Sequence, residues 1–342
     1  MTINQSPLQP TPVGAFRFNT DSSKLEYYDG NQWVNITSTS PEAQTGGTRG
    51  IISGGGNPGQ TNIIEYVNIS STGDFADFGD LNNTVNGPAG SADRTRGITS
   101  GGYTGAPAYI NVIDYITIDI LGNATDFGDL TVGRGYSAGG SNSTRGLTGG
   151  SWGPSNSDVI DYITIATTGN ANDFGNLTSA RQCDAAVASP TRAVFCGGCA
   201  GSPLVVGTTD RLDYVTIAST GNAADFGDLH TGTFGTAAAS NAVRGLIMGG
   251  NSNPTQLNNI QYITIATLGN ALDFGDTPAT HYYGAGCASP TRAIVTGGST
   301  PSVTNNVDFA EIMSKGNGFD FGNLANSKDQ STGFSNGHGG LG

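Results

Sequence analysis

The sequence has 342 residues, which is enough for one large domain or two ordinary ones. Charged residues make up only 12%, and 14 basic against 27 acidic residues give a net charge of −13, which disfavours binding to nucleic acid and to anionic membranes. No apolar run approaches the length of a membrane span, and the first residues lack the basic and apolar regions of a secretory signal.

The composition predicts an all-β protein. Glycine accounts for 54 residues without a collagen-like period, so it indicates turns. Short runs of Ile, Val, Thr, Tyr and Phe alternate with clusters of Gly, Asn, Asp and Ser, which is the pattern of strands and turns.

Residues 1–40 form a segment that does not repeat. After several prolines, three short strands are expected at Ala15–Asn19, Lys24–Tyr28 and Gln32–Ile36. A sheet of this size cannot bury enough surface to be stable alone, so we expect this segment to mediate attachment or oligomerisation. Residues 41–47 are expected to be a linker. The candidate attachment residues are aromatic: Phe16, Phe18, Tyr27, Tyr28 and Trp33.

The stretch from Gly14 to Ile36, with its closely spaced aromatic residues and an Asp-Gly-Asn turn, resembles a hairpin module of virion proteins of tailed bacteriophages. In tail-fibre and appendage proteins, such a module often precedes larger β domains. The resemblance implies a structural protein located in the virion.

A repeat fills residues 48–342. Six arginines recur at spacings of 47, 49, 47, 52 and 48 residues: Arg49, Arg96, Arg145, Arg192, Arg244 and Arg292. Each is followed by a glycine pair, then by a polar residue next to an aromatic one, and last by Asp-Phe-Gly. The polar residues are Glu65, Asp114, Asp161, Asp213, Gln261 and Asp308. The phenylalanines are Phe78, Phe127, Phe174, Phe226, Phe274 and Phe321.

Each unit predicts four short strands, which favours a six-bladed β-propeller of four-stranded blades. The interval between the polar residue and the phenylalanine is constant, and nearly all length variation lies in the loop after the glycine pair. The C-terminal segment, residues 331–342, is expected to supply one strand and no more, lying beside residues 48–56 to complete the first blade. The order of features in each unit resembles the kelch repeat: a Gly-Gly pair, a variable loop, a strand with an acidic residue and a later arginine. Phenylalanine stands where the kelch repeat has tryptophan.

Several motifs have a structural and a chemical interpretation. The six arginines are expected to pair with the acid of their own unit, except where Gln261 replaces it, with anion binding as the alternative. The turn Gly-Asn-Ala-x-Asp-Phe-Gly-Asp predicts Asx-type turns, with calcium binding as the alternative. Cys196 and Cys199 are expected to flank an ordinary turn, with a redox or metal role as the alternative. We therefore expect no cofactor and no metal.

Catalysis is not expected, because the three histidines occupy different repeat positions and almost every acid follows the repeat. Two enzymatic alternatives remain open. A copper-radical oxidase would use His281, Tyr282, Tyr283 and Cys287, and a glycan-acting enzyme would need carboxylates that break the repeat.

The sequence thus predicts a non-enzymatic tail-fibre or appendage component of a tailed-phage virion, with other virion proteins and a host-surface glycan or protein as partners. The alternative is a capsid or tail decoration protein without host contact. The binding face is expected where the variable loops gather, because insertions on one face of a repeat protein often mark its binding surface. The candidate residues are Tyr103, Tyr109, Trp152, Leu204, Val205 and Val206.

Overall fold

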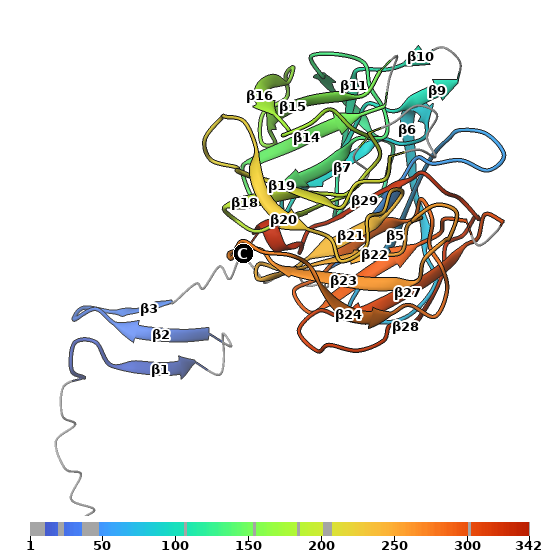
Figure 1. Cartoon of the computed structure of the whole chain (residues 1–342). Helices are drawn as coiled ribbons and strands as arrows, with labels where there is room; N and C mark the ends of the chain where they lie inside the picture. The colour runs from blue at the N-terminus through green and yellow to red at the C-terminus, as the bar shows by residue number, and fades with distance from the viewer. Residues whose placement is uncertain are drawn as a thin grey trace, which may run out of the picture. The chain divides into compact units, whose positions relative to one another are not determined.

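The computed structural model describes residues 11–19, 24–35, 48–105, 108–152, 155–182, 185–200, 207–299 and 302–341. The chain divides into two compact units, Met1–Thr45 and Gly46–Gly342, which are described separately (Figure 1). The proposed linker, residues 41–47, lies outside the described residues, so its boundaries stay a prediction.

The first unit is a three-stranded antiparallel sheet of β1 (Phe16–Asn19), β2 (Lys24–Tyr28) and β3 (Trp33–Asn35), in the order β1-β2-β3. The Asp29 carboxylate shapes the second turn by accepting the backbone N–H groups of Asn31 and Gln32, each at 2.8 Å. These two bonds stabilise the ionised form and lower the pKa of Asp29. The expected strands and hairpin are confirmed.

The second unit contains six antiparallel four-stranded sheets, numbered here by the repeat unit that supplies most of each sheet. Sheet 1 joins β29 (Thr332–Ser335), β4 (Arg49–Ser53), β5 (Thr61–Asn68) and β6 (Ala76–Val85). Sheet 2 joins β7 (Ala89–Ala92), β8 (Arg96–Ser100), β11 (Val112–Thr117) and β12 (Thr125–Asp129). Sheet 3 joins β13 (Ala138–Ser141), β14 (Arg145–Ser151), β15 (Ser157–Thr164) and β16 (Asn172–Asn176).

The other three sheets follow the same order of strands. Sheet 4 joins β17 (Ala185–Ala188), β18 (Arg192–Cys196), β19 (Arg211–Thr216) and β20 (Ala224–Asp228). Sheet 5 joins β21 (Ala237–Ser240), β22 (Arg244–Met248), β23 (Asn259–Thr264) and β24 (Leu272–Asp276). Sheet 6 joins β25 (Ala285–Ala288), β26 (Arg292–Thr296), β27 (Asn306–Glu311) and β28 (Phe319–Asn323).

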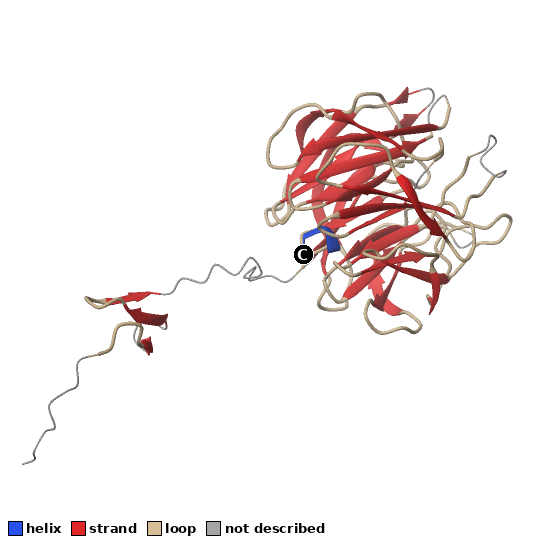
Figure 2. Cartoon of the chain, turned by 60° about the vertical axis from the view of Figure 1, so that its left-hand side comes forward, coloured by secondary structure: helices blue, strands red, loops and turns tan. Residues whose placement is uncertain are grey.

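The sheets follow one another in a cyclic, propeller-like arrangement, with their first strands innermost. Each innermost strand contacts the innermost strand of the next sheet, and β29 of sheet 1 contacts both β25 and β7. These strands are rich in Gly, Ala and Ser, which allows six backbones to converge. A Cβ added at Gly139, for example, would collide with the carbonyl oxygen of Gly90. The all-β, propeller-like class is therefore as expected (Figure 2).

The core lies between neighbouring sheets. The phenylalanine of each Asp-Phe-Gly is buried and meets the aromatic residue of the third strand edge-on, with ring centroids 5.8–6.0 Å apart. Apolar residues on the two faces of the third strand, such as Ile260 and Ile263, contact different neighbouring sheets and are also buried. Coverage on both faces explains why this strand does not alternate strictly.

The predicted pairing of the six arginines with acids of their own units is wrong, apart from an additional contact between Arg292 and Glu311. Each guanidinium stacks on the aromatic residue of the third strand, 4.7–5.0 Å from the ring centroid. Each also donates to a backbone carbonyl of the following sheet, as Arg49 does to Ile118 at 2.8 Å. Arg292 of sheet 6 donates in the same way to Ser70 of sheet 1 at 3.2 Å. The arginines thus join successive sheets rather than strands within one sheet.

Four of the five third-strand acids find their partners in the preceding sheet, at the position seven residues after its phenylalanine. Three buried ion pairs result, Arg134 with Asp161, Arg181 with Asp213 (2.6 Å) and Lys328 with Glu65 (2.7 Å), and His281 contacts Asp308 at 2.9 Å. Asp114 instead accepts the Asn82 side-chain amide at 2.7 Å and the Asn82 N–H at 3.0 Å. Where the acid is replaced by Gln261, the cationic position holds Thr233. Gln261 instead accepts the N–H of Thr231 at 3.1 Å.

The repeated Asn and Asp residues cap backbone groups of the neighbouring sheet. In the first five sheets, the N–H of the residue after Asp-Phe-Gly donates at 3.1 Å to an asparagine of the following sheet: Asn123, Asn170, Asn222, Asn270 and Asn317. Asp74 of sheet 1 accepts the equivalent N–H from Asn323 of sheet 6 at 2.9 Å. These side chains accept hydrogen bonds from the backbone of the adjacent sheet. They were expected to bond to their own backbone, and that expectation is wrong. Each turn therefore also joins two sheets.

The C-terminal strand β29 pairs antiparallel with β4, and this part of the prediction is confirmed. The expectation that the segment supplies one strand and no more is wrong, because residues 336–341 continue across the axis and end in a 3-10 turn, η1 (Gly339–Leu341). This turn contacts β17 and β21, and it is the only helical element of the described part of the chain (Figure 2). No helix in the described ranges is long and apolar enough to cross a membrane.

Candidate functional site

Three of the predicted binding residues come together on the face that carries the variable loops. Tyr103 lies in β9 (Tyr103–Gly105) and Tyr109 in β10 (Ala108–Tyr109), an extra hairpin between β8 and β11 in which the two tyrosines are paired across the strands. Their ring centroids are 5.1 Å apart with an interplanar angle of 46°. Trp152 stands after the glycine pair of the next sheet. The three half-buried rings are called the aromatic platform below.

Hydrogen bonds hold the platform in place. Burial raises the pKa of the Tyr109 hydroxyl, the neighbouring Tyr103 adds to the rise, and a side-chain hydrogen bond with Trp152 opposes it. Tyr103 also exchanges two backbone hydrogen bonds with Asn86, at 3.0 and 2.8 Å. The rings are therefore fixed to two neighbouring sheets, whereas an unsupported loop would leave them free to rotate.

The other three predicted binding residues, Leu204, Val205 and Val206, lie outside the described residues. The base of their loop is described. There Cys199 forms backbone bridges to Gln182 on one side and to Thr208 on the other. Whether this loop contributes to binding stays a prediction.

A lid of aromatic and amide side chains covers the axis on the same face. Tyr136, Tyr283 and Gln330 occupy the same repeat position, and all three adopt a left-handed backbone with φ of 53°, 59° and 52°. The Tyr136 hydroxyl donates to Gln330 at 3.2 Å, and the Gln182 amide donates to the Tyr283 hydroxyl at 3.2 Å. Because these side chains interlock across sheets, they close this end of the axis.

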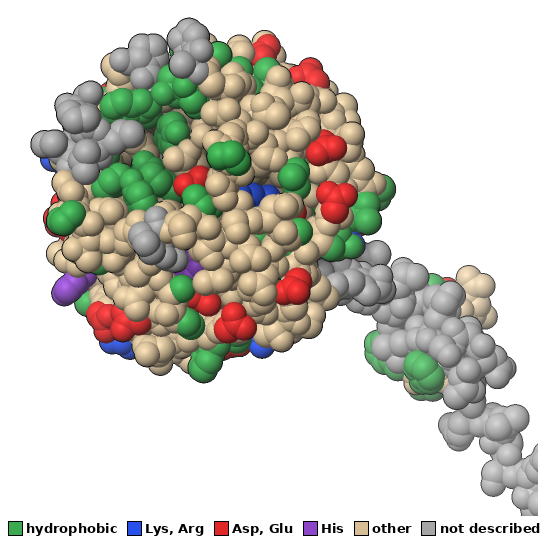
Figure 3. Space-filling view, turned by 90° about the vertical axis from the view of Figure 1, so that its right-hand side faces the viewer, with side chains coloured by type: hydrophobic (Ala, Val, Ile, Leu, Met, Phe, Trp, Pro, Cys, Tyr) green, Lys and Arg blue, Asp and Glu red, His purple; other side chains and the backbone are tan. Residues whose placement is uncertain are grey.

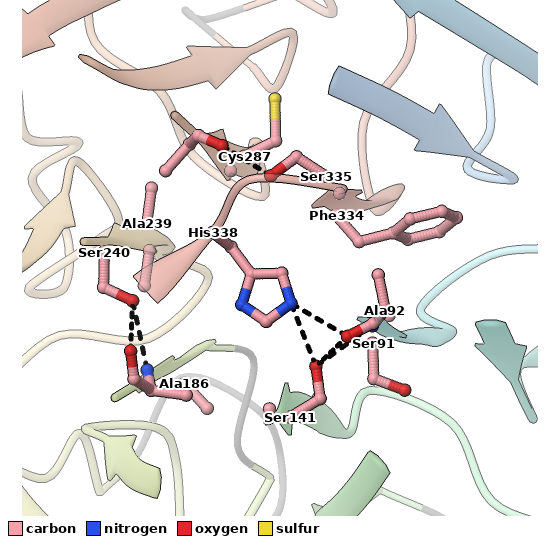
Figure 4. A pocket seen from close by; sticks show the side chains of 18 residues that line it. Ser91, Ala92, Ser141, Ala186, Ala239, Ser240, Cys287, Phe334, Ser335 and His338 are labelled. Atoms are coloured by element: carbon pink, nitrogen blue, oxygen red, sulfur yellow. Dashed lines mark hydrogen bonds between the residues drawn. The ribbon is translucent and has the colours of Figure 1, made fainter. Parts of the chain in front are cut away.

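The opposite end of the axis is closed by the C-terminal turn (Figure 4). His338 points into the axial cavity, where Nε2 donates to the Ala92 carbonyl at 2.9 Å and Nδ1 accepts the N–H of Gly340 at 3.1 Å. This bonding pattern requires the neutral Nε2–H tautomer. Arg94 fastens the turn by donating to the Leu341 carbonyl at 3.2 Å.

The axial cavity between these two ends is small, about 50 Å³ in its part beside His338. Three serines on alternate innermost strands bond to alanine carbonyls of the preceding sheet: Ser141 to Ala92, Ser240 to Ala188 and Ser335 to Ala288. A space of this size holds a few water molecules and no larger ligand. The axis is therefore not the binding site, and the face of the platform is the better candidate.

The residues of the copper-oxidase alternative do not form one group. His281 is buried, with Nδ1 2.8 Å from the Gly297 carbonyl and Nε2 2.9 Å from Asp308, so both of its ring nitrogens are engaged. Tyr282 and Tyr283 belong to the aromatic cluster at the loop face. Cys287 lies instead in the core between sheets 6 and 1, where burial raises the pKa of its thiol to about 12.

The structure also bears on the other motifs. Gly197 and Gly198, between Cys196 and Cys199, have φ of 57° and 111°, as an ordinary turn requires. Both cysteines are buried. In the ranges that the structure describes, no group of three or more His, Cys, Asp or Glu side chains is placed to hold a metal ion.

The attachment candidates in the first unit divide between the two faces of its sheet. Trp33 and Tyr28 lie on one face with ring centroids 5.5 Å apart, and Arg17 stacks on Trp33 while its Nε forms an ion pair with Glu26 at 2.7 Å. Phe16 and Phe18 lie on the opposite face and are 67% and 62% exposed. Tyr27, paired with Phe16, shares that exposed face. We call Phe16, Phe18 and Tyr27 the aromatic face.

Sequence alone missed the partners of the third-strand acids, the lid and the C-terminal turn. Four of these partners could have been found, because each stands seven residues after the phenylalanine of its unit: Arg134, Arg181, His281 and Lys328. The same position holds Val85 in the first unit and Thr233 in the fourth. No family model matches the chain, and no curated protein matches it either.

Proposed function

We propose that this chain is a structural component of a tailed-phage virion, of the tail-fibre or appendage type. In this proposal Gly46–Gly342 is a closed six-bladed kelch-like propeller whose loop face contacts a host receptor or a partner protein. The N-terminal unit attaches the propeller to the particle. The observation that carries the proposal is the presence of two aromatic surfaces on two separate compact units.

Contacts between sheets 6 and 1 support the closed form. Gly73 and Phe75 donate backbone N–H groups to Phe321 and Asn323 at 2.9 and 2.8 Å. The Lys328–Glu65 ion pair and the Arg292–Ser70 hydrogen bond join the same two sheets. Every type of contact between successive sheets is thus repeated between the last sheet and the first.

Exposure of the aromatic face supports a role in attachment. Large apolar side chains on a sheet this small are costly to leave in water, and aromatic residues are enriched in interface cores. Tyr28 and Trp33 are already packed within the unit. We therefore place the attachment surface on Phe16, Phe18 and Tyr27.

The test compares particles assembled with wild-type protein and with the double variant Phe16→Ser/Phe18→Ser. The expected result is loss of the protein from purified particles while the isolated protein keeps its thermal transition. A matched control, Val132→Ser, removes an exposed apolar side chain from the second unit. Normal incorporation of the double variant would contradict the proposed attachment. Electron microscopy of labelled particles distinguishes a fibre or appendage from a decoration protein away from any host contact.

A further inference from the structure

The aromatic platform has three features that together define a class of ligand. The first is the arrangement of its rings, which a cross-strand pair and a hydrogen bond to Trp152 hold in fixed positions. A platform that is rigid before binding loses little conformational entropy when a ligand arrives. Flat, half-exposed rings suit a ligand that presents a C–H face.

The second feature is electrostatic. Burial and the neighbouring Tyr103 raise the pKa of Tyr109, so its hydroxyl stays neutral at physiological pH. The loop face carries acidic side chains mainly toward its periphery, whereas hydrophobic side chains gather toward one side (Figure 3). With a net charge of −13, the protein disfavours an anionic ligand near this surface.

The third feature is an unused hydrogen-bond acceptor. Asn86 is bonded through its backbone to Tyr103, but its buried Oδ1 has no hydrogen-bond partner among the described residues. A buried acceptor of this kind costs free energy until a donor reaches it. A ligand hydroxyl would supply that donor if the Asn86 side chain turned toward the rings on binding.

We propose that the platform binds neutral sugar rings, with the C–H face of a hexopyranose against Tyr103, Tyr109 and Trp152 and a sugar hydroxyl donating to Asn86. The inference rests on the proposed function, because it assigns the chemistry of the host receptor at the same face. Sialylated and other acidic glycans are excluded by charge. A protein receptor is the competing outcome of the test.

The chain contains two tryptophans, so Trp33→Phe leaves Trp152 as the only indole. The probes are neutral trisaccharides (maltotriose, mannotriose and cellotriose), with sialyllactose as an acidic sugar of similar size. We expect a saturable change in Trp152 fluorescence with at least one neutral sugar and a response to sialyllactose at least about tenfold weaker. Tyr103→Ala and Asn86→Leu should each weaken binding about tenfold or more, equivalent to about 1.4 kcal/mol. The control Phe319→Ala, which removes an exposed aromatic side chain of sheet 6 outside the platform, should leave binding unchanged.

Absence of a saturable response to every neutral sugar overturns the proposal, as does equal binding of sialyllactose. Adsorption of particles that carry Trp152→Ala to host cells is measured as well, so that failure of the sugar-binding proposal can be told apart from failure of the proposed function. If adsorption is lost although no sugar binds, the face still serves attachment and its receptor is a protein. If sugar binding is lost but adsorption is normal, the sugar site stands and the proposed role of this face in host attachment fails.

Discussion

Asp213→Asn removes the charge of one buried ion pair while keeping its shape, and we expect it to destabilise the second unit strongly. Arg181 and Asp213 are at most 1% exposed, with Nη1 2.6 Å from Oδ2. The carboxylate also accepts hydrogen bonds from the Thr178 hydroxyl at 2.7 Å and the Thr178 N–H at 3.1 Å. The substitution leaves a guanidinium in a dry interior without its counter-charge.

Breaking a buried pair in this way costs about 3–5 kcal/mol. At about 2–4 °C per kcal/mol for a large domain, the melting temperature should fall by about 6–20 °C. The protein has its own neutral residues at the two equivalent positions, Thr233 and Gln261, where Gln261 accepts the N–H of Thr231. The double variant Arg181→Thr/Asp213→Gln, which copies these residues, should therefore recover about 2 kcal/mol of the loss or more.

The assay is thermal unfolding followed by circular dichroism, with urea unfolding as a second measure. Asp225→Asn, at an exposed position of the same sheet, is the matched control and should change stability by about 0.5 kcal/mol at most. A loss below about 1 kcal/mol for Asp213→Asn, or a double variant less stable than the single one, would refute the assignment of this contact as a buried ion pair.

Three further predictions concern pH and the C-terminal segment. Burial raises the pKa of Asp329 to about 6, so the folded protein holds a proton on this carboxyl and loses stability as pH rises from about 4 to 6. Asp329→Asn introduces the residue that stands at the equivalent position 86. This variant should have a higher melting temperature than wild type at about pH 7 and nearly the same one near about pH 4. Burial lowers the pKa of His338, so the stability that its neutral ring gives the C-terminal turn is present above about pH 6.5 and is lost as pH falls toward the folded pKa. A proton on Nδ1 of His338 would face the N–H of Gly340; the bond from Nε2 to Ala92 and the charge of Asp93 favour protonation of the ring, and Arg94 opposes it. In acid, hydrogen exchange at residues 338–341 should therefore accelerate beyond the intrinsic rate in the wild-type protein but not in His338→Gln. Equal acceleration in both proteins would contradict this role of His338. Removing residues 331–342 takes away β29 and leaves the edge of β4 unpaired, so the truncated protein should aggregate in size-exclusion chromatography, and a monomer with unchanged melting temperature would disprove the pairing.

The regular part of the fold could be predicted from sequence because each repeat contains its own strand and turn signals. Arginine, glycine pair and Asp-Phe-Gly mark the strand ends in every unit. The weak strand signal before Arg49 indicated that a segment from elsewhere in the chain would pair with β4, as β29 does. Contacts between units were harder to predict. Arg181 and Asp213 are 32 residues apart, and nothing local distinguishes this pairing from one between Arg192 and Asp213.

The candidate site was only partly predictable for a similar reason. Aromatic residues in variable loops suggested Tyr103, Tyr109 and Trp152, but not that a hairpin would bring the tyrosines together. The C-terminal turn gave no periodic signal, since it consists of glycines around His338 and Leu341. Its conformation depends on the cavity that the six innermost strands create, and a local sequence pattern does not show that cavity.

In the proposed closed propeller, the alternating serines along the axis mean that the ring requires an even number of sheets. Ser141, Ser240 and Ser335 each bond to the alanine of the preceding innermost strand, so the sheets form the couples 2–3, 4–5 and 6–1. Inserting or deleting a single sheet would place two serine strands or two alanine strands side by side and leave backbone groups at the axis without their usual partner. The smallest exchangeable piece of this ring is therefore a couple of sheets, about a third of its circumference.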